Sequence, residues 1–148
     1  MKRLYPDQPV VGVGAVIVQD RKIVLILRAN EPSKGKWTIP GGLVDLAESL
    51  EAAVLREAQE ETGLAASDPA LLDVVSNVDI DEQGKVKYHY VIIDYLVHVK
   101  SLEAKAASDA ADLRWVPLDE VECYNLTASF RLFFRNNRKK LEQVNSYP

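Results

Sequence analysis

The chain has 148 residues, of which 47% are hydrophobic and 27% are charged, and its formal net charge is −4. This composition is typical of a soluble globular protein, and we expect one domain spanning residues 1–148. The acidic balance gives no basic field for a nucleic-acid backbone, and no apolar run approaches the ~20 residues of a membrane span. We therefore expect neither nucleic acid nor a membrane as a partner.

The single cysteine, Cys123, excludes an internal disulfide and suits a reducing compartment. The N-terminal segment lacks the apolar run of a signal peptide. Both features favour a cytoplasmic location. We expect Cys123 itself to be a buried apolar residue.

The first half of the chain reads as a hairpin followed by a loop and a helix. β-Branched residues predict the two strands of the hairpin, and Gly63 is typical of a residue that closes a helix. The expected elements are strands at 10–18 and 22–27, a polar loop at 29–36 and a helix at 48–61.

The second half reads as three further strands and a C-terminal helix. The expected elements are strands at 71–80, 87–99 and 113–116, a loop at 101–112, and an amphipathic helix at 127–141. Strands, a helix, more strands and a second helix predict an α/β (α+β) fold, with a mixed sheet covered by helices.

The helix at 48–61 carries an unusual concentration of acidic residues. At ~100° per residue, Glu57, Glu60 and Glu61 share an arc of about 100° and face one way. Clusters made only of carboxylate oxygens suit hard cations such as Mg²⁺ or Mn²⁺. The alternative is a solvated acidic helix face, balanced by Arg56 and the positive helix N-terminus. The adjacent arc is expected to face the core: Val54, Ala58 and Thr62.

The spacing of these residues points to a known family. Gly42 is followed after five residues by Glu48, and after seven more by the run REAQEETGL, residues 56–64. This segment, residues 42–64, resembles the Nudix box, G-x5-E-x7-R-E-U-x-E-E-x-G-U with U apolar, and every fixed position matches. The resemblance implies the Nudix fold, an α/β/α sandwich with a central mixed β-sheet flanked by helices.

The resemblance also implies roles for residues of the box. Glu57, Glu60 and Glu61 correspond to metal ligands of the family, and Mg²⁺ is the expected cofactor with Mn²⁺ as a substitute. Gly41 and Gly42 allow close backbone approach to a ligand or metal. Two residues support this shell: Glu48 as a member of it or as a group that orients Arg56, and Arg56 as a bidentate guanidinium. Ala47 departs from the glycine that relatives often carry there.

The implied reaction is hydrolysis of a nucleoside diphosphate linked to another moiety, by a metal-activated water. Glu60 or Glu61 is a candidate for the residue that positions this water or takes its proton. An acidic residue outside the box is the other candidate, either Asp109 or Asp112, and Asp109 is favoured. The alternative is that both are solvated loop residues.

The flanking segments resemble Nudix proteins described as ADP-ribose pyrophosphatases, through residues 11–15, 35–37 and 88–91. ADP-ribose or a related nucleotide sugar is therefore the expected substrate, and a homodimer is expected by analogy. One alternative is a nucleoside triphosphate pyrophosphohydrolase, including one for oxidised nucleotides. Another is a non-catalytic nucleotide-binding module. The expected substrate contacts are Arg28, Lys36, Trp37 and Gly42.

Overall fold

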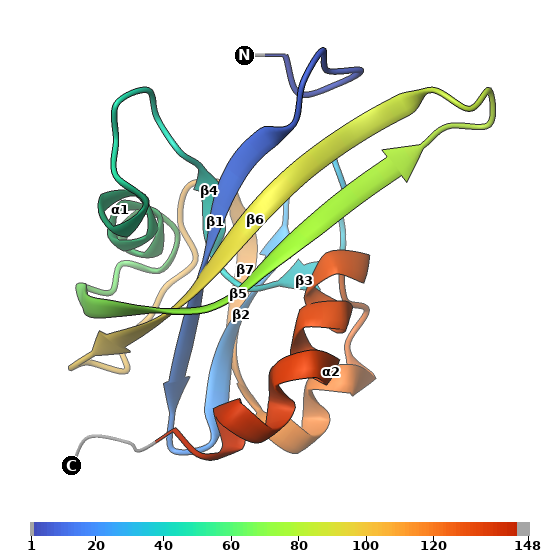
Figure 1. Ribbon diagram of the computed structural model, residues 1–148. Coiled ribbons are helices and arrows are strands. Elements are labelled where there is room, and N and C mark those ends of the chain that lie inside the picture. Colours follow the sequence, from blue (N-terminus) through green and yellow to red (C-terminus); the bar gives the residue numbers. More distant parts are fainter. Residues whose placement is uncertain (1, 145–148) are drawn as a thin grey trace.

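The computed structural model describes residues 2–144 and shows a mixed β-sheet between two helices (Figure 1). The strands are β1 (Val10–Gln19), β2 (Lys22–Arg28), β3 (Trp37–Thr38), β4 (Gly41–Leu43), β5 (Ala66–Ile80), β6 (Val86–Val99) and β7 (Ala110–Pro117). The helices are α1 (Leu50–Thr62), the short 3-10 helix η1 (Leu118–Cys123) and α2 (Ala128–Glu142). The predicted fold class is confirmed.

The sheet follows from the way the first hairpin opens. Asp20 and Arg21 adopt positive φ angles of 52° and 62°, as a tight turn with the right twist requires. β1 and β2 pair only next to this turn, at Gln19–Lys22 and Val18–Ile23, and then separate. β1 then pairs with β4 and, in parallel, with β6, whereas β2 pairs with β3 and β7. The seven strands therefore form one sheet in the order β3-β2-β1-β6-β5, with β4 and β7 added beside β1 and β2.

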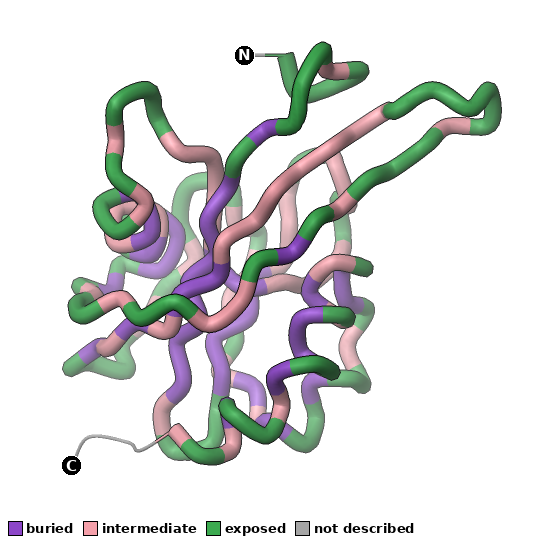
Figure 2. The backbone as a smooth tube through the Cα atoms, in the orientation of Figure 1, coloured by how far each residue is buried: buried purple, intermediate pink, exposed green. Residues whose placement is uncertain are grey.

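Alternate residues of β1 serve two different cores, because successive side chains of a strand point to opposite faces. Val13, Ala15 and Ile17 pack in the cluster that contains the buried face of α1. Val16 and Val18 pack in the cluster that contains the phenylalanines of α2. β1 is therefore buried on both faces, and Figure 2 shows burial concentrated along it.

α1 begins and ends where local chemistry requires. The Ser49 hydroxyl accepts a hydrogen bond from the Ala52 N–H at 3.1 Å, which caps the N-terminus. Gly63 closes the helix with a φ of 74°, in the left-handed region that favours glycine. The arc expected to face the core is fully buried: Val54, Ala58 and Thr62.

Two predicted boundaries are wrong. β5 begins at Ala66, five residues before the predicted start at 71, because β6 is long enough to pair back to Ala66 through Val99. β7 begins at Ala110, inside the segment 101–112 predicted to be loop, because the edge of β2 supplies pairing as far as Arg28. Tertiary pairing overrides weak local propensity at both ends.

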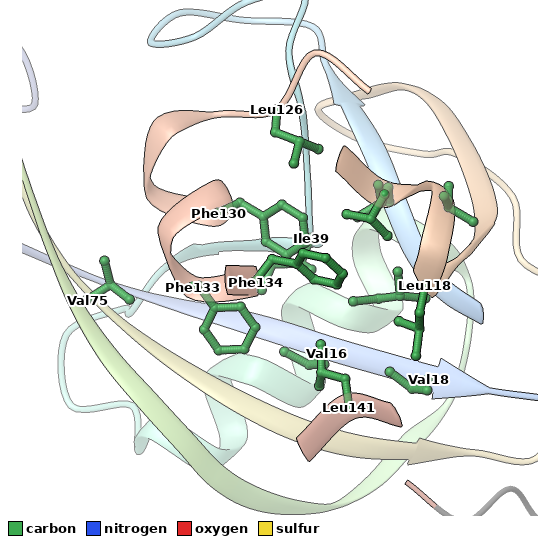
Figure 3. Close-up of a cluster of buried hydrophobic side chains, with 14 residues drawn as sticks. Val16, Val18, Ile39, Val75, Leu118, Leu126, Phe130, Phe133, Phe134 and Leu141 are labelled. Carbon is green, nitrogen blue, oxygen red and sulfur yellow. The ribbon is translucent and has the colours of Figure 1, made fainter. Parts of the chain in front are cut away.

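α2 closes the second face of the sheet. Thr127 caps it by accepting from the Phe130 N–H at 3.3 Å. Phe130, Phe133 and Phe134 point toward the sheet, where they pack with residues such as Val16 (Figure 3). The predicted amphipathic C-terminal helix is confirmed.

Cys123, expected to be buried, is exposed at the end of η1. The buried positions of that short helix are taken by Leu118 and Val121. Within residues 2–144, no helix has the length and apolar character needed to span a membrane.

Candidate active site

The glycine pair of β4 allows α1 to approach the sheet closely. β4 runs antiparallel to β1, with Gly42 opposite Val13 and Gly41 opposite Gly14. A Cβ atom at Gly42 would overlap the Glu57 carboxylate, and one at Gly41 would overlap the Val13 carbonyl oxygen. Gly41 faces backbone atoms, so no side chain fits there, whereas a side chain at Gly42 would have to displace the Glu57 carboxylate.

Glu61 is buried where α1 meets β4, with only 4% of its surface exposed. Its Oε1 accepts a hydrogen bond from the Gly41 N–H at 2.6 Å. Burial raises the pKa of Glu61 to about 7; the Gly41 hydrogen bond opposes the rise, and the charges of Glu57 and Asp109 add to it. A nearby cation would therefore stabilise the ionised form of this carboxyl.

Arg56 ties the carboxylates to the loop that precedes α1. Its Nε and Nη2 donate to the two oxygens of Glu48 at 2.7 and 2.9 Å, and Nη2 also donates to the Leu43 carbonyl at 3.0 Å. Its Nη1 donates to Glu57 at 2.8 Å and to Glu60 at 3.2 Å. The hydrogen bonds from Arg56 lower the pKa of Glu48 to about 2. Arg56 thus holds three carboxylates in fixed positions.

Glu57 and Glu60 differ in their surroundings. Their side chains are 14% and 47% exposed, respectively. Burial raises the pKa of Glu57, the hydrogen bond from Arg56 opposes this rise, and the charges of Glu60 and Asp109 add to it. Mutual repulsion among these oxygens is the electrostatic environment that a divalent cation relieves.

Metal binding requires some rearrangement of these side chains. Among the residues that the structure describes, no three His, Cys, Asp or Glu side chains converge closely enough to hold a metal ion as they stand. Glu57 and Glu60 are turned toward Arg56, and Glu61 toward the Gly41 N–H. The donor chemistry fits a hard divalent cation, because all the donors are carboxylate oxygens.

The two aspartates considered outside the box lie in different places. Asp109 precedes β7, and its charge adds to the burial that raises the pKa of both Glu57 and Glu61. Asp112 lies within β7, and its carboxylate is 3.5 Å from Nε of Arg114. The structure therefore brings Asp109 toward the glutamates. We refer to Glu57, Glu60, Glu61 and Asp109 as the acidic cluster.

A cavity of about 400 Å³ is lined in part by Gly41 and Gly42. Gly41 donates to Glu61 and Gly42 lies against the Glu57 carboxylate, so the cavity is linked to the acidic cluster through these two glycines. It lies on the face of the sheet that α2 covers, and it is large enough for a small-molecule ligand. Three of the four expected substrate contacts line it: Arg28, Lys36 and Gly42.

Trp37, the fourth expected contact, is not among the described residues that line this cavity. Its ring makes an edge-on contact with Tyr124, at 5.3 Å between centroids, and the Arg114 guanidinium lies 5.1 Å from its centre. The Trp37 side chain is thus engaged at the rim of the α2 core.

One wall of the cavity was not anticipated from the sequence. It is formed by the alternate residues Tyr88, Tyr90, Ile92 and Asp94 of β6, and the two tyrosine rings stack at 6.2 Å. Strand periodicity places these four side chains on one face. The sequence contains no signal that this face borders a cavity, because the cavity depends on where α2 packs.

The fold and the site together define a class of enzyme. A mixed sheet lies between two helices, and a glutamate-rich helix is locked against a glycine pair beside a ligand-sized cavity. This is the arrangement of an α+β hydrolase that acts on phosphoanhydrides. The model of the NUDIX domain family matches residues 8–136, and the chain therefore belongs to the Nudix family of hydrolases. Nudix hydrolases generally need a divalent metal ion.

Similar proteins agree with this assignment. The chain is 40% identical over 119 residues to the ADP-ribose pyrophosphatase of Methanocaldococcus jannaschii, an alignment that covers 80% of this chain and 68% of that protein. The MutT NUDIX hydrolase of Burkholderia pseudomallei is 38% identical, with a TM-score of 0.73, and the match covers 94% of this chain and 100% of that one. The NUDIX domain of Shewanella oneidensis NrtR, solved with ADP ribose, is 27% identical with a TM-score of 0.75, and the match covers 92% and 90% of the two chains.

Proposed function

We propose that this protein hydrolyses the pyrophosphate bond of ADP-ribose or of a related nucleoside diphosphate sugar. The observation that carries the proposal is the cavity of about 400 Å³ whose lining includes Gly41 and Gly42, the two glycines that contact Glu61 and Glu57. The name of the Methanocaldococcus jannaschii relative and the ligand of the NrtR domain support the choice of substrate.

The lining of the cavity suits a nucleotide. Arg28 and Lys36 supply positive charge to its lining, and the charge of Arg28 also acts on Glu61. Tyr88 and Tyr90 offer aromatic surface along the β6 wall. A ligand with both anionic and aromatic groups matches this lining.

The residues of the acidic cluster and Arg56 have different proposed roles. We propose Glu60, Glu61 and Asp109 as the candidates for the group that positions the attacking water or takes its proton. Burial raises the pKa of Glu61 to about 7, and a bound cation would lower this pKa and keep the carboxylate ionised. Arg56 would act as a positioning residue, since its hydrogen bonds hold Glu48, Glu57 and Glu60.

We propose Mg²⁺ as the cofactor, with Mn²⁺ as a substitute. Glu57, Glu60 and Glu61 would hold the ion, and Gly41 would approach it through its backbone. Glu48 would complete the shell through Arg56, to which it is already bound at 2.7 Å. The ion would neutralise the charge that builds on the phosphoryl oxygens during transfer.

A substrate panel tests this function. It comprises ADP-ribose, nucleotide sugars, dinucleoside polyphosphates, and normal and oxidised nucleoside triphosphates, each incubated with Mg²⁺ and assayed for phosphate after phosphatase treatment. We expect ADP-ribose or a nucleotide sugar to be cleaved fastest. Faster cleavage of a triphosphate would contradict the substrate assignment, and turnover of none with either Mg²⁺ or Mn²⁺ would favour a binding module.

We also propose a cytoplasmic location and a homodimer. The location is supported by the single cysteine, which suits a reducing compartment. The dimer is supported by apolar side chains exposed on the long β5 strand at the edge of the sheet, such as Leu71 and Val78.

A further inference from the structure

Asp94 of β6 is a buried carboxylate in the wall of the cavity, and the proposed hydrolysis gives it no role. Only 3% of its surface is exposed, and it lines the cavity. Its Oδ1 has no hydrogen-bond partner among residues 2–144. Burying a carboxylate oxygen without a donor costs free energy, so this position retains hydrogen-bonding capacity that the described chain does not use.

The surroundings of Asp94 explain why the protein supplies no donor. Gly14 lies opposite in register, and the space of its missing side chain holds the Asp94 Oδ1 beside the Ile39 methyl group. Asn137, a buried amide on α2, donates instead to Asp73 at 2.8 Å and to the Phe133 carbonyl at 2.9 Å. This oxygen of Asp94 thus lies against a glycine and an apolar side chain, in a residue that lines the cavity.

Register across the sheet relates Asp94 to the acidic cluster. Gly41, Gly14 and Asp94 face one another in a single row across β4, β1 and β6. Two strand spacings put Asp94 about 10 Å from Gly41, whose N–H binds Glu61. In a nucleotide whose phosphates lie at the acidic cluster, the ribose hydroxyls remain closer to the phosphates than the far edge of the base does. The base is therefore the part that reaches Asp94.

We propose that Asp94 accepts a hydrogen bond from the amino group of the nucleobase and thereby selects amino-bearing bases such as adenine. The inference rests on the proposed function, because that function places the phosphates at the acidic cluster. Once ionised, a carboxylate is an acceptor only, so it pairs with an amino group and rejects a carbonyl at the same position. Burial, with the neighbouring charge of Asp73, raises the pKa of Asp94 to about 7.

The test compares binding of AMP and IMP, which differ at the 6-position of the base, by titration calorimetry without metal at about pH 8.5, above the pKa of Asp94. We expect wild type to bind AMP at least about tenfold more tightly than IMP. Asp94→Val, which removes both oxygens, should abolish the preference. Asp79→Asn should keep it, because Asp79 lines the same cavity from β5 but is exposed.

Asp94→Asn provides a second variant in case the valine substitution prevents folding. An amide can accept from an amino group or donate to a carbonyl, so the preference for AMP should shrink toward unity. Equal affinity of wild type for AMP and IMP, or an unchanged preference in Asp94→Asn, would overturn the inference. The inference would also be overturned if wild type bound 2′-deoxy-AMP more weakly than AMP but bound IMP as tightly as AMP, because that result would place the contact on the ribose.

These outcomes are separate from those of the substrate panel. The calorimetry needs no turnover, so an AMP preference that depends on Asp94 supports base selection even if ADP-ribose is not hydrolysed. Conversely, hydrolysis of ADP-ribose with no discrimination between AMP and IMP leaves the proposed function intact and removes the role of Asp94.

Discussion

Replacing Asp94 by asparagine should change how the stability of the protein depends on pH. Burial and the charge of Asp73 raise the pKa of Asp94 from the ordinary 3.8 to about 7. Between these values the folded state binds more protons than the unfolded state, so the wild-type free energy of unfolding falls as pH rises from about 4 to about 7. At about 1.4 kcal/mol per pKa unit, the loss amounts to at most about 4 kcal/mol above neutral pH. An asparagine side chain in place of Asp94 does not titrate, so the variant escapes this loss.

Urea unfolding of both proteins at several pH values from about 4 to 9 measures the effect, with tryptophan fluorescence as the probe. The Asp94→Asn variant should gain stability relative to wild type as pH rises, and the gain should level off above about pH 7. Glu61 has a pKa raised in the same direction, but it is present in both proteins and cancels in the difference. Asp79→Asn is the control and should show no such gain. A constant difference between wild type and Asp94→Asn across the pH range would refute the reasoning.

Three further predictions concern the acidic cluster and the residues that contact it. Glu61→Gln should lower kcat by orders of magnitude with little change in melting temperature, because the amide oxygen can still accept from the Gly41 N–H. A rate near that of wild type would contradict the assignment of Glu61 as a metal ligand or base. Arg56→Ala should lower both activity and the free energy of unfolding, since the substitution releases Glu48 and Glu57. Lost activity with an unchanged urea midpoint would indicate that Arg56 contacts the substrate instead. Gly42→Ala should destabilise the fold by about 1–3 kcal/mol in urea unfolding, because the added methyl group overlaps the Glu57 carboxylate, which Arg56 holds at 2.8 Å. Unchanged stability would show that the Glu57 side chain can move aside at no cost.

The sequence alone predicts the parts of this protein that local chemistry determines. Periodicity predicts the helix that carries the acidic residues and the burial of Val54 and Ala58, because both follow from a helix packed on one side. β-Branching predicts β1 and β2, and Gly63 is expected to end α1, where it adopts a left-handed φ.

The parts that depend on distant contacts are not accessible in this way. The burial of Glu61 arises from the closeness of β4, which the helix pattern does not encode. Trp37 is an expected substrate contact from the sequence, but in the structure Arg114 and Tyr124 lie against its ring. Asp94 reads as one polar residue in an apolar strand, and its place in the cavity wall becomes visible only when α2 and Gly14 are positioned around it.

Glycine serves the same purpose at two positions on opposite faces of the sheet. Gly42 leaves room for the Glu57 carboxylate on the side of α1, and Gly14 leaves room for the Asp94 carboxylate on the side of α2. Gly42 pairs with Val13 and Gly14 with Gly41, so the two glycines that make this room lie in adjacent pairs of the β1–β4 ladder. The residues proposed for hydrolysis and the residue proposed for base selection thus share one structural support. A substitution that widens the β1–β4 contact should therefore weaken turnover and base discrimination together.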